Sequence, residues 1–283
     1  FLILIQKKRV EFKQLMSNRS YNSGSQWSRY QNNGYNIPRV PHNPQYIDLP
    51  ALKQKNLIIQ KLKQFPIILI EGATGSGKTT QVPQYLLREW PSVRPNNAIA
   101  CTQPRKVAAK SVAKRVSCEY YCNLNANPYN IVGNEVGYQV RLDSRIKPNI
   151  TRLIYMTEGM LLRKAMTGEK DLEGFGVIII DEAHERTIEV DLLMGYLKDL
   201  VKIRKDLKVI IMSATMNIKR FQKYFNCSND AIIKIPGRTF TINYRFLQKP
   251  TNNYIDTAID IILAIHKINY ENGHILVFLT GFS

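Results

Sequence analysis

Acidic residues are few in this chain compared with basic ones. Its 283 residues include 22 Asp and Glu against 40 Lys and Arg, so the formal net charge is +18. A surplus of that size favours a polyanionic partner, nucleic acid first and an anionic membrane second. Two other origins stay open: a solvated basic surface, and the skewed composition of a genome rich in Lys and Asn.

Cysteine is also sparse, and its spacing excludes two common uses of the residue. The four cysteines are Cys101, Cys118, Cys122 and Cys227. They form no C-x-x-C pair, and none has the spacing to histidine that zinc sites show. We therefore expect reduced, partly buried thiols in a nuclear or cytosolic protein.

Long apolar runs are missing near the start of the chain. The segment Phe1–Ile5 is apolar, but it is too short for a membrane span or for the core of a secretory signal, and no basic region precedes it. The first residue is Phe rather than Met, so we expect a fragment of a longer protein or the product of a doubtful gene start.

The N-terminal extension, residues 1–48, contains a long polar stretch with few aliphatic side chains. Between Ser17 and Pro44 it is rich in Asn, Ser, Gln, Tyr and Gly. Such a stretch buries too little apolar surface to offset its ordering entropy, so we predict a disordered polar and basic extension. Its Tyr and Arg side chains could stack on RNA, but a passive tail is the preferred interpretation.

From Leu49 onward, apolar runs alternate with amphipathic stretches. The runs predict strands at 66–70, 98–101, 135–141, 152–156, 177–180, 208–212, 241–247 and 274–279. The amphipathic stretches predict helices at 52–65, 79–90, 105–120, 158–166, 188–200 and 254–267. Strands that alternate with helices in this way indicate a doubly wound α/β sheet with ligands at the carboxyl ends of its strands.

The pattern of strands and helices restarts after Pro236-Gly237. We therefore expect one complete lobe at 49–236 and the beginning of a second at 237–283. In the helix that begins near residue 188, an apolar stripe is expected to face the core. That stripe consists of Ile188, Leu192, Leu193, Tyr196, Leu197 and Leu200.

A glycine-rich segment at 72–79 lies between a predicted strand and a predicted helix. It fits the pattern G-x-x-x-x-G-K-[ST], whose backbone N–H groups hold the phosphates of a nucleotide. Its glycines permit the close approach that this contact needs. Lys78 is expected to contact the β- and γ-phosphates, and the Thr79 hydroxyl to ligate Mg²⁺. The predicted nucleotide-binding residues are Gly72, Gly75, Ser76, Gly77, Lys78, Thr79 and Thr80.

An acidic pair, Asp181-Glu182, follows the apolar run 177–180, which is typical of a buried parallel strand. At the carboxyl end of that strand the pair should lie near the phosphate loop. We expect Asp181 to hold Mg²⁺, usually through water, and Glu182 to polarise the attacking water. The alternative for the pair is a favourable charge at a helix N-terminus. His184 taken alone is more often a hydrogen-bonded structural histidine than a functional one.

Six motifs in this order resemble those of the DEAH-box ATP-dependent RNA helicases of superfamily 2. They lie at 72–79, 102–109, 157–163, 181–184, 213–215 and 278–281. The resemblance covers the chain from about Leu49 to its end and implies a RecA-like P-loop NTPase lobe followed by the start of a second RecA-like lobe. The motif at 157–163 is most similar to the branch that works in pre-mRNA splicing and ribosome biogenesis.

The resemblance also implies roles for individual residues. ATP, or another NTP, would be bound and hydrolysed with Mg²⁺ by Lys78, Thr79, Asp181 and Glu182. Arg115 would stack on the base, although its context alone suggests a helix-surface arginine. The backbone of single-stranded RNA would be contacted by Arg105, Lys106 and Thr157, and hydrolysis would be coupled to lobe movement by His184, Ser213 and Thr215.

The later motifs of that family have no counterpart in these 283 residues. A missing arginine finger costs roughly 10³–10⁵ in rate, so the chain alone is expected to bind nucleotide but to hydrolyse it poorly. The resemblance implies a nuclear protein that acts on RNA or a ribonucleoprotein, with a possible activator protein and no membrane. Two rivals stay open: a non-catalytic half-helicase that binds RNA or a partner, and a P-loop NTPase with another substrate.

Overall fold

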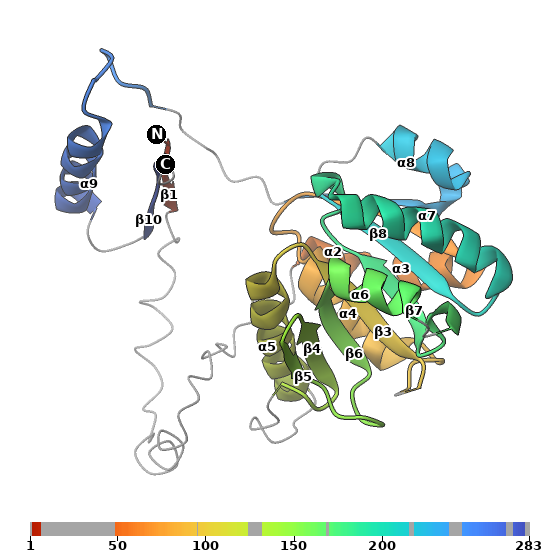
Figure 1. Ribbon diagram of the computed structural model, residues 1–283. Helices are drawn as coiled ribbons and strands as arrows, with labels where there is room; N and C mark the ends of the chain where they lie inside the picture. Colours follow the sequence, from red (N-terminus) through yellow and green to blue (C-terminus); the bar gives the residue numbers. More distant parts are fainter. Residues whose placement is uncertain are drawn as a thin grey trace, which may run out of the picture. The chain divides into compact units, whose positions relative to one another are not determined.

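The computed structural model describes residues 2–6, 49–94, 96–123, 132–167, 170–214, 218–237, 245–269 and 274–280. These residues fall into two compact units. The larger unit lies within residues 38–240, and the smaller one combines the N-terminal residues with those from Thr241 onward. Figure 1 shows the elements of both.

The larger unit is built on an eight-stranded sheet with the strand order β5-β4-β6-β3-β7-β8-β2-β9. Neighbouring strands run parallel except β5, which pairs antiparallel with β4 at one edge. The strands β3 and β7 are buried along their whole length; β7 is apolar throughout, while β3 ends in the buried polar residues Thr102 and Gln103. The strands are β2 (Ile67–Gly72), β3 (Ala98–Gln103), β4 (Val136–Val140), β5 (Asp143–Arg145), β6 (Leu153–Thr157), β7 (Phe175–Ile180), β8 (Lys208–Ser213) and β9 (Ile232–Ile235).

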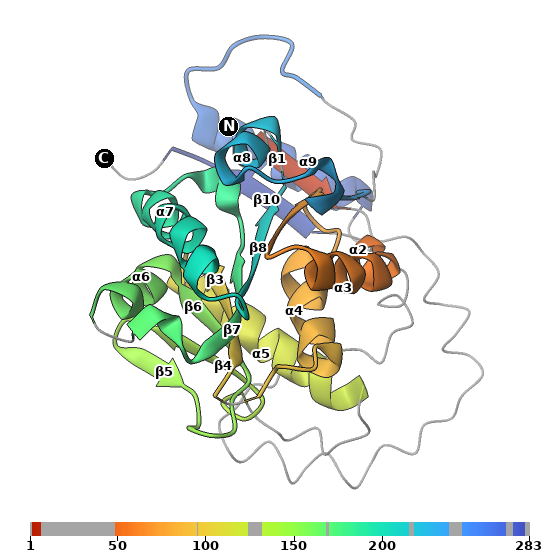
Figure 2. The ribbon, with the colours of Figure 1, turned by 90° about the vertical axis from the view of Figure 1, so that its right-hand side faces the viewer.

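Helices cover both faces of this sheet (Figure 2). Side chains of α3, α4 and α5 pack with Ile68, Ile70 and the strand residues that point the same way. Side chains of α6, α7 and α8 pack with Ile67, Leu69 and the alternate strand residues on the opposite face. This arrangement confirms the predicted doubly wound α/β fold. The helices are α2 (Pro50–Lys53), α3 (Lys55–Gln64), α4 (Lys78–Glu89), α5 (Lys106–Asn123), α6 (Glu158–Met166), α7 (Ile188–Ile203) and α8 (Ile218–Phe225), with short 3₁₀ turns η3 (Lys170–Leu172), η4 (Ala183–Glu185) and η5 (Asn229–Ala231).

Two strands, β5 and β9, and one α-helix, α8, of the larger unit were not predicted, nor were its 3₁₀ turns. The strands β5 and β9 are only three and four residues long, and β5 has the polar sequence Asp-Ser-Arg, so neither gives a periodic signal over a useful window. In α8 the helical spacing of the buried Phe221 and Phe225 was overlooked. The predicted core stripe of α7 was partly wrong, because Ile188 is 78% exposed and Leu192 is 54% exposed. The helix instead buries Val190, Leu193, Met194, Leu197, Leu200 and Val201.

The smaller unit contains a helix and a two-stranded antiparallel sheet. Strand β1 (Leu2–Gln6) pairs with β10 (His274–Phe278), and Leu2 lies opposite Phe278. The helix α9 (Tyr254–Asn269) agrees with the predicted helix at 254–267. The strand at Leu2–Gln6 corrects the prediction of disorder for these residues, while the rest of the extension, 7–48, lies outside the described residues. No strand is present at 245–247, and the rest of the predicted strand, 241–244, is not described.

The described cysteines are present as thiols and not as disulfides. Cys101, Cys118 and Cys227 form no disulfide. Burial raises the pKa of Cys101, and it raises the pKa of Cys227 to about 11, so both thiols stay protonated at neutral pH. The side chain of Cys122 lies outside the described residues. Within the described part of the chain, no helix combines the length and the apolar character that crossing a membrane requires.

Candidate nucleotide-binding site

The phosphate loop and the acidic pair meet at the carboxyl edge of the sheet. The loop follows β2, the acidic pair follows β7, and β8 lies between these two strands. The charge of Asp181 acts on the Lys78 ammonium group, and the Thr79 hydroxyl donates a hydrogen bond to the Asp181 carboxylate. The structure therefore brings together the two motifs that the sequence placed more than a hundred residues apart.

The loop has the backbone conformation that a phosphate cradle needs. Gly75 and Gly77 have φ values of +81° and +90°, in the left-handed region that only glycine adopts without strain. A Cβ atom at Gly72 would lie 3.0 Å from both Ile235 Cβ and Lys78 Cδ, so a side chain at this position would crowd both neighbours. The buried Ser76 hydroxyl has no hydrogen-bond partner within the described part of the chain. Such an unsatisfied polar atom fits a site where ligand oxygens complete the hydrogen bonds.

Lys78 turns its ammonium group toward the loop itself. Its Nζ donates to the carbonyl oxygens of Gly72 and Ala73, the latter at 3.1 Å. Burial lowers the pKa of Lys78, while the charges of Asp181 and Glu182 oppose that shift. A buried ammonium group surrounded by carbonyl oxygens is suited to bind phosphate oxygens in the same place. The first turn of α4 is closed by Thr80, whose hydroxyl lies 3.3 Å from the Gly77 carbonyl oxygen.

Asp181 is fully buried, and its carboxylate is held by three donors. Gln103 Nε2 donates to Oδ2 at 2.8 Å, the Glu182 backbone N–H donates to Oδ1 at 2.9 Å, and the Thr79 hydroxyl donates as well. Burial nevertheless raises the pKa of Asp181, because these bonds and the charge of Lys78 offset the loss of water only in part. A cation beside this carboxylate would stabilise its charged form, and carboxylate and hydroxyl oxygens are the ligands that Mg²⁺ prefers.

The side chains at this site supply too few ligands to bind Mg²⁺ without the phosphate oxygens of a nucleotide. Among the described residues, no group of three or more His, Cys, Asp or Glu side chains could hold a metal ion. Mg²⁺ is usually bound through one or two protein oxygens together with phosphate oxygens and water. Thr79 and Asp181 supply two such oxygens beside the phosphate loop.

Glu182 occupies a strained backbone position next to Asp181. Its φ of 50° and ψ of 36° lie in the left-handed region, which costs about 1–3 kcal/mol for a residue other than glycine. Burial raises the pKa of Glu182, and the charge of Asp181 adds to that effect. His184 Nδ1 lies 3.4 Å from Glu182 Oε2. Strain and a raised pKa at one carboxylate are typical of a residue that takes part in proton transfer.

Gln103 is a member of this site that the sequence did not single out. It ends β3, and its side chain is buried. The signal that could have revealed it is its place at the carboxyl end of a strand that neighbours β7. Gln103 also lies opposite Thr157 in the register of β3 and β6.

The predicted RNA-contacting residues lie at the same edge of the sheet. Thr157 ends β6, while Arg105 and Lys106 are exposed at the start of α5, just after Gln103. Of the predicted coupling residues, Ser213 ends β8, and its buried hydroxyl has no partner among the described residues. His184 is exposed, and Thr215 lies outside the described residues.

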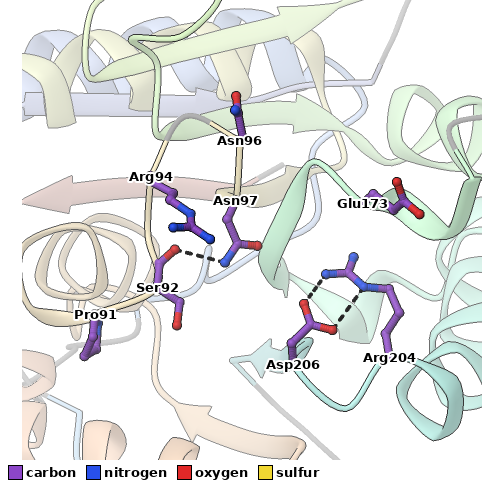
Figure 3. A pocket seen from close by; sticks show the side chains of 8 residues that line it. All are labelled: Pro91, Ser92, Arg94, Asn96, Asn97, Glu173, Arg204 and Asp206. Atoms are coloured by element: carbon purple, nitrogen blue, oxygen red, sulfur yellow. Dashed lines mark hydrogen bonds and ion pairs between the residues drawn. The ribbon is translucent and has the colours of Figure 1, made fainter.

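A hollow of about 470 Å³ lies at the amino ends of β3, β7 and β8, and Figure 3 shows the residues that line it. Arg204, one of the charged residues that line this hollow, forms an ion pair with Asp206. Arg204 Nη1 also donates to the carbonyl oxygens of Leu172 at 2.8 Å and Phe175 at 3.0 Å. Since this guanidinium is already engaged in holding the chain, we assign the nucleotide to the phosphate loop rather than to this hollow.

Comparison with known families identifies a helicase domain in this chain. A model of the DEAD/DEAH box helicase family matches residues 50–224, which is more than half of the chain. The matched region runs from the start of α2 into α8 and contains the phosphate loop, Gln103 and the acidic pair.

Proposed function

The chain belongs to the DEAD/DEAH box helicase family, and from this premise we propose that it is an ATP-dependent RNA helicase of the DEAH branch. The observation that supports the proposal is the convergence of Lys78, Thr79 and the acidic pair at one edge of the sheet. A phosphate loop and an acidic pair in this arrangement are the parts with which P-loop NTPases bind and hydrolyse a nucleotide.

Each residue of the site has a separate task in this reaction. The loop backbone and Lys78 bind the phosphates, while Thr79 and Asp181 would hold Mg²⁺, which neutralises charge on the phosphates during transfer. Glu182 orients the attacking water and accepts its proton. The raised pKa of Glu182 makes it a stronger base than an ordinary glutamate. Arg115, half exposed on α5, stacks on the base.

The proposed RNA site uses phosphate contacts rather than base readout. Arg105, Lys106 and Thr157 lie at the edge of the sheet that also carries the nucleotide site. A net charge of +18 supports sequence-independent binding of this kind. His184, Ser213 and Thr215 would link hydrolysis to movement of the RNA-binding surfaces.

The biological setting is part of the same proposal. The motif at 157–163 resembles the branch that acts in pre-mRNA splicing and ribosome biogenesis, and this resemblance is the ground for choosing these processes. We therefore propose an RNA or ribonucleoprotein substrate in the nucleus, with an activator protein as a further partner. Fluorescent tagging of the protein in cells tests the nuclear assignment, and exclusion from the nucleus would contradict it.

The biochemical proposal is tested by titrating the purified chain with ATP, with and without Mg²⁺, and with single-stranded RNA at several salt concentrations. We expect Mg²⁺-dependent ATP binding, and RNA binding whose log affinity falls linearly with log salt. Lys78→Ala should abolish ATP binding without changing RNA binding. The double substitution Arg105→Ala and Lys106→Ala should weaken RNA binding without changing ATP binding. Binding of ATP without RNA would indicate an NTPase with another substrate. Binding of RNA without ATP would indicate a non-catalytic RNA-binding protein.

A further inference from the structure

A buried carboxylate joins the helix of the phosphate loop to the helix that carries Arg115. Glu119 of α5 is 5% exposed. Its Oε2 accepts hydrogen bonds from Gln81 Nε2 at 3.0 Å and from Gln84 Nε2 at 2.7 Å. Its Oε1 accepts a hydrogen bond from Arg115 Nε at 2.8 Å. One oxygen is therefore tied to α4, and the other holds the guanidinium.

The carboxylate could not be buried without these donors. Removing an ionised carboxylate from water is strongly unfavourable unless hydrogen bonds and an opposite charge compensate for the lost hydration. Gln81 and Gln84 are themselves buried, so their amides are fixed relative to the backbone of α4. Tyr155 links this cluster to the phosphate loop. The charge of Glu119 acts on Tyr155, and the Tyr155 hydroxyl donates a hydrogen bond to the Thr79 carbonyl oxygen at 2.9 Å.

Arg115 differs from the rest of the cluster in its exposure. Its side chain is 49% exposed, whereas Glu119 and the two glutamines are buried. An arginine side chain carries about 2 kcal/mol of rotamer entropy, and a planar guanidinium must be fixed before it can stack well on a ring. The hydrogen bond from Nε to the buried carboxylate restricts this freedom before any ligand arrives.

We propose that Glu119 is a positioning residue for base recognition: it holds the Arg115 guanidinium, in register with α4 and the phosphate loop, where the nucleotide base stacks. The inference rests on the proposed nucleotide function and on the stacking role of Arg115. It extends both by assigning a role to Glu119, Gln81 and Gln84. Base affinity then depends on a residue that does not itself contact the nucleotide.

The test compares Mg²⁺-ATP with Mg²⁺-tripolyphosphate, which has phosphates but no base, by calorimetric titration of the full chain. In the variant Glu119→Gln, the amide oxygen can still accept from Gln81 and Gln84, but an NH₂ group then faces Arg115. We expect ATP affinity to fall by about threefold to thirtyfold, the range of a cation–π contact, with tripolyphosphate affinity unchanged. Arg115→Lys, which keeps the charge but loses the planar group, should have the same effect. The double variant should be no weaker than Arg115→Lys alone.

Each other outcome has a definite meaning. If Arg115→Lys weakens ATP binding but Glu119→Gln does not, the positioning role is wrong and the base-stacking role stands. Equal losses for ATP and tripolyphosphate in Glu119→Gln would overturn the proposal, because they would show a general loosening of α4. If neither variant changes ATP affinity, both roles are wrong, while nucleotide binding stands. If the unsubstituted chain binds neither ligand, the proposed function itself fails.

A control checks that loss of a partly buried ion pair elsewhere in the sheet does not give the same result. Glu135→Gln removes a carboxylate that pairs with Arg152 at the amino ends of β4 and β6, away from the phosphate loop. This variant should bind ATP and tripolyphosphate as the unsubstituted chain does. Thermal unfolding of all variants verifies that each affinity is measured on folded protein.

Discussion

The amide of Gln103 donates to the Asp181 carboxylate at 2.8 Å and so joins the end of β3 to the end of β7. Gln103 also lies opposite Thr157 in the pairing of β3 with β6. One buried glutamine therefore lies between Asp181, the proposed Mg²⁺ ligand, and Thr157, one of the proposed RNA contacts. Gln103 thus adjoins the proposed Mg²⁺ ligand through its side chain and Thr157 through the pairing of the two strands.

The variant Gln103→Leu tests that relationship. It removes one of the donors that stabilise the charged form of Asp181, so the pKa of Asp181 should rise further. We expect the affinity for Mg²⁺-ATP to fall by about tenfold to a hundredfold, as is usual when a residue that orients a metal ligand is lost. Titrations with ATP in Mg²⁺ and in EDTA measure this effect. An unchanged Mg²⁺ dependence would show that Gln103 does not position Asp181.

The pH dependence of ATP hydrolysis reports on Glu182. Burial raises the pKa of this carboxylate, so it remains protonated to a higher pH than the ordinary value of 4.5 would allow. Since the base must be ionised, the single-turnover rate should fall as pH decreases through the raised pKa, and this fall should begin above pH 4.5. Glu182→Gln should abolish the activity, and with it the fall of the rate at low pH. A rate that is independent of pH down to 4.5 would contradict the role of Glu182 as base.

Thr187 stabilises the start of α7 and a buried carboxylate at the same time. Its hydroxyl accepts from the Val190 backbone N–H and donates to Glu158 Oε2 at 2.6 Å, while Glu158 Oε1 has no partner among the described residues. Thr187→Ala should cost about 0.5–2 kcal/mol through loss of the cap alone. Thr187→Ser is the matched control, since it retains the hydroxyl.

The cost of Thr187→Ala should depend on pH. Burial raises the pKa of Glu158 above its unfolded value, so the folded state binds more protons and its stability falls as pH rises. Without the Thr187 hydroxyl the pKa rises further, and the destabilisation should be larger at pH 7 than near pH 5. Urea unfolding at the two pH values measures the difference. A cost that does not change with pH would show that Glu158 is not affected.

Arg204 should be important for stability and unimportant for nucleotide binding. Its Nη1 donates to the Leu172 and Phe175 carbonyl oxygens next to a turn in which Asp171 and Leu172 both have positive φ. Arg204→Lys cannot make all these bonds, so we expect a loss of about 1–3 kcal/mol in the free energy of unfolding. ATP affinity of the folded variant should be unchanged.

An exposed ion pair provides the comparison for Arg204. Lys202 and Asp199 form such a pair on α7, and both side chains are more than half exposed. Lys202→Ala should leave the urea midpoint unchanged within error. If Arg204→Lys were equally neutral, the bonds from Arg204 would not be holding the turn.

The succession of β2, the phosphate loop and α4 could be predicted because the residues that indicate it are neighbours in the sequence. The apolar run, the glycines and Lys78 are consecutive in the chain, and the same is true of β7 and Asp181. The partners of these residues could not be predicted. Gln103 reaches a carboxylate 78 positions away, and Glu119 receives a hydrogen bond from a residue 38 positions away, so neither contact leaves a periodic pattern.

The error in α7 has a different origin. Apolar side chains cover more than one face of this helix, so periodicity allows more than one choice of buried stripe. The structure buries the stripe that contains Val190, which lies three residues after the capping Thr187. The rotation of the helix was thus decided by its contacts with the sheet, which are tertiary.

The pairing of β1 with β10 has a consequence for the order of folding. Leu2 and Phe278 are neighbours in the sheet although almost the whole chain lies between them. Closing a flexible loop of that length costs about 5 kcal/mol in chain entropy. During synthesis β1 leaves the ribosome before β10 and has no partner until β10 follows, whereas the last strand of the larger sheet, β9, ends at residue 235. The larger unit can therefore fold cotranslationally before β1 and β10 pair.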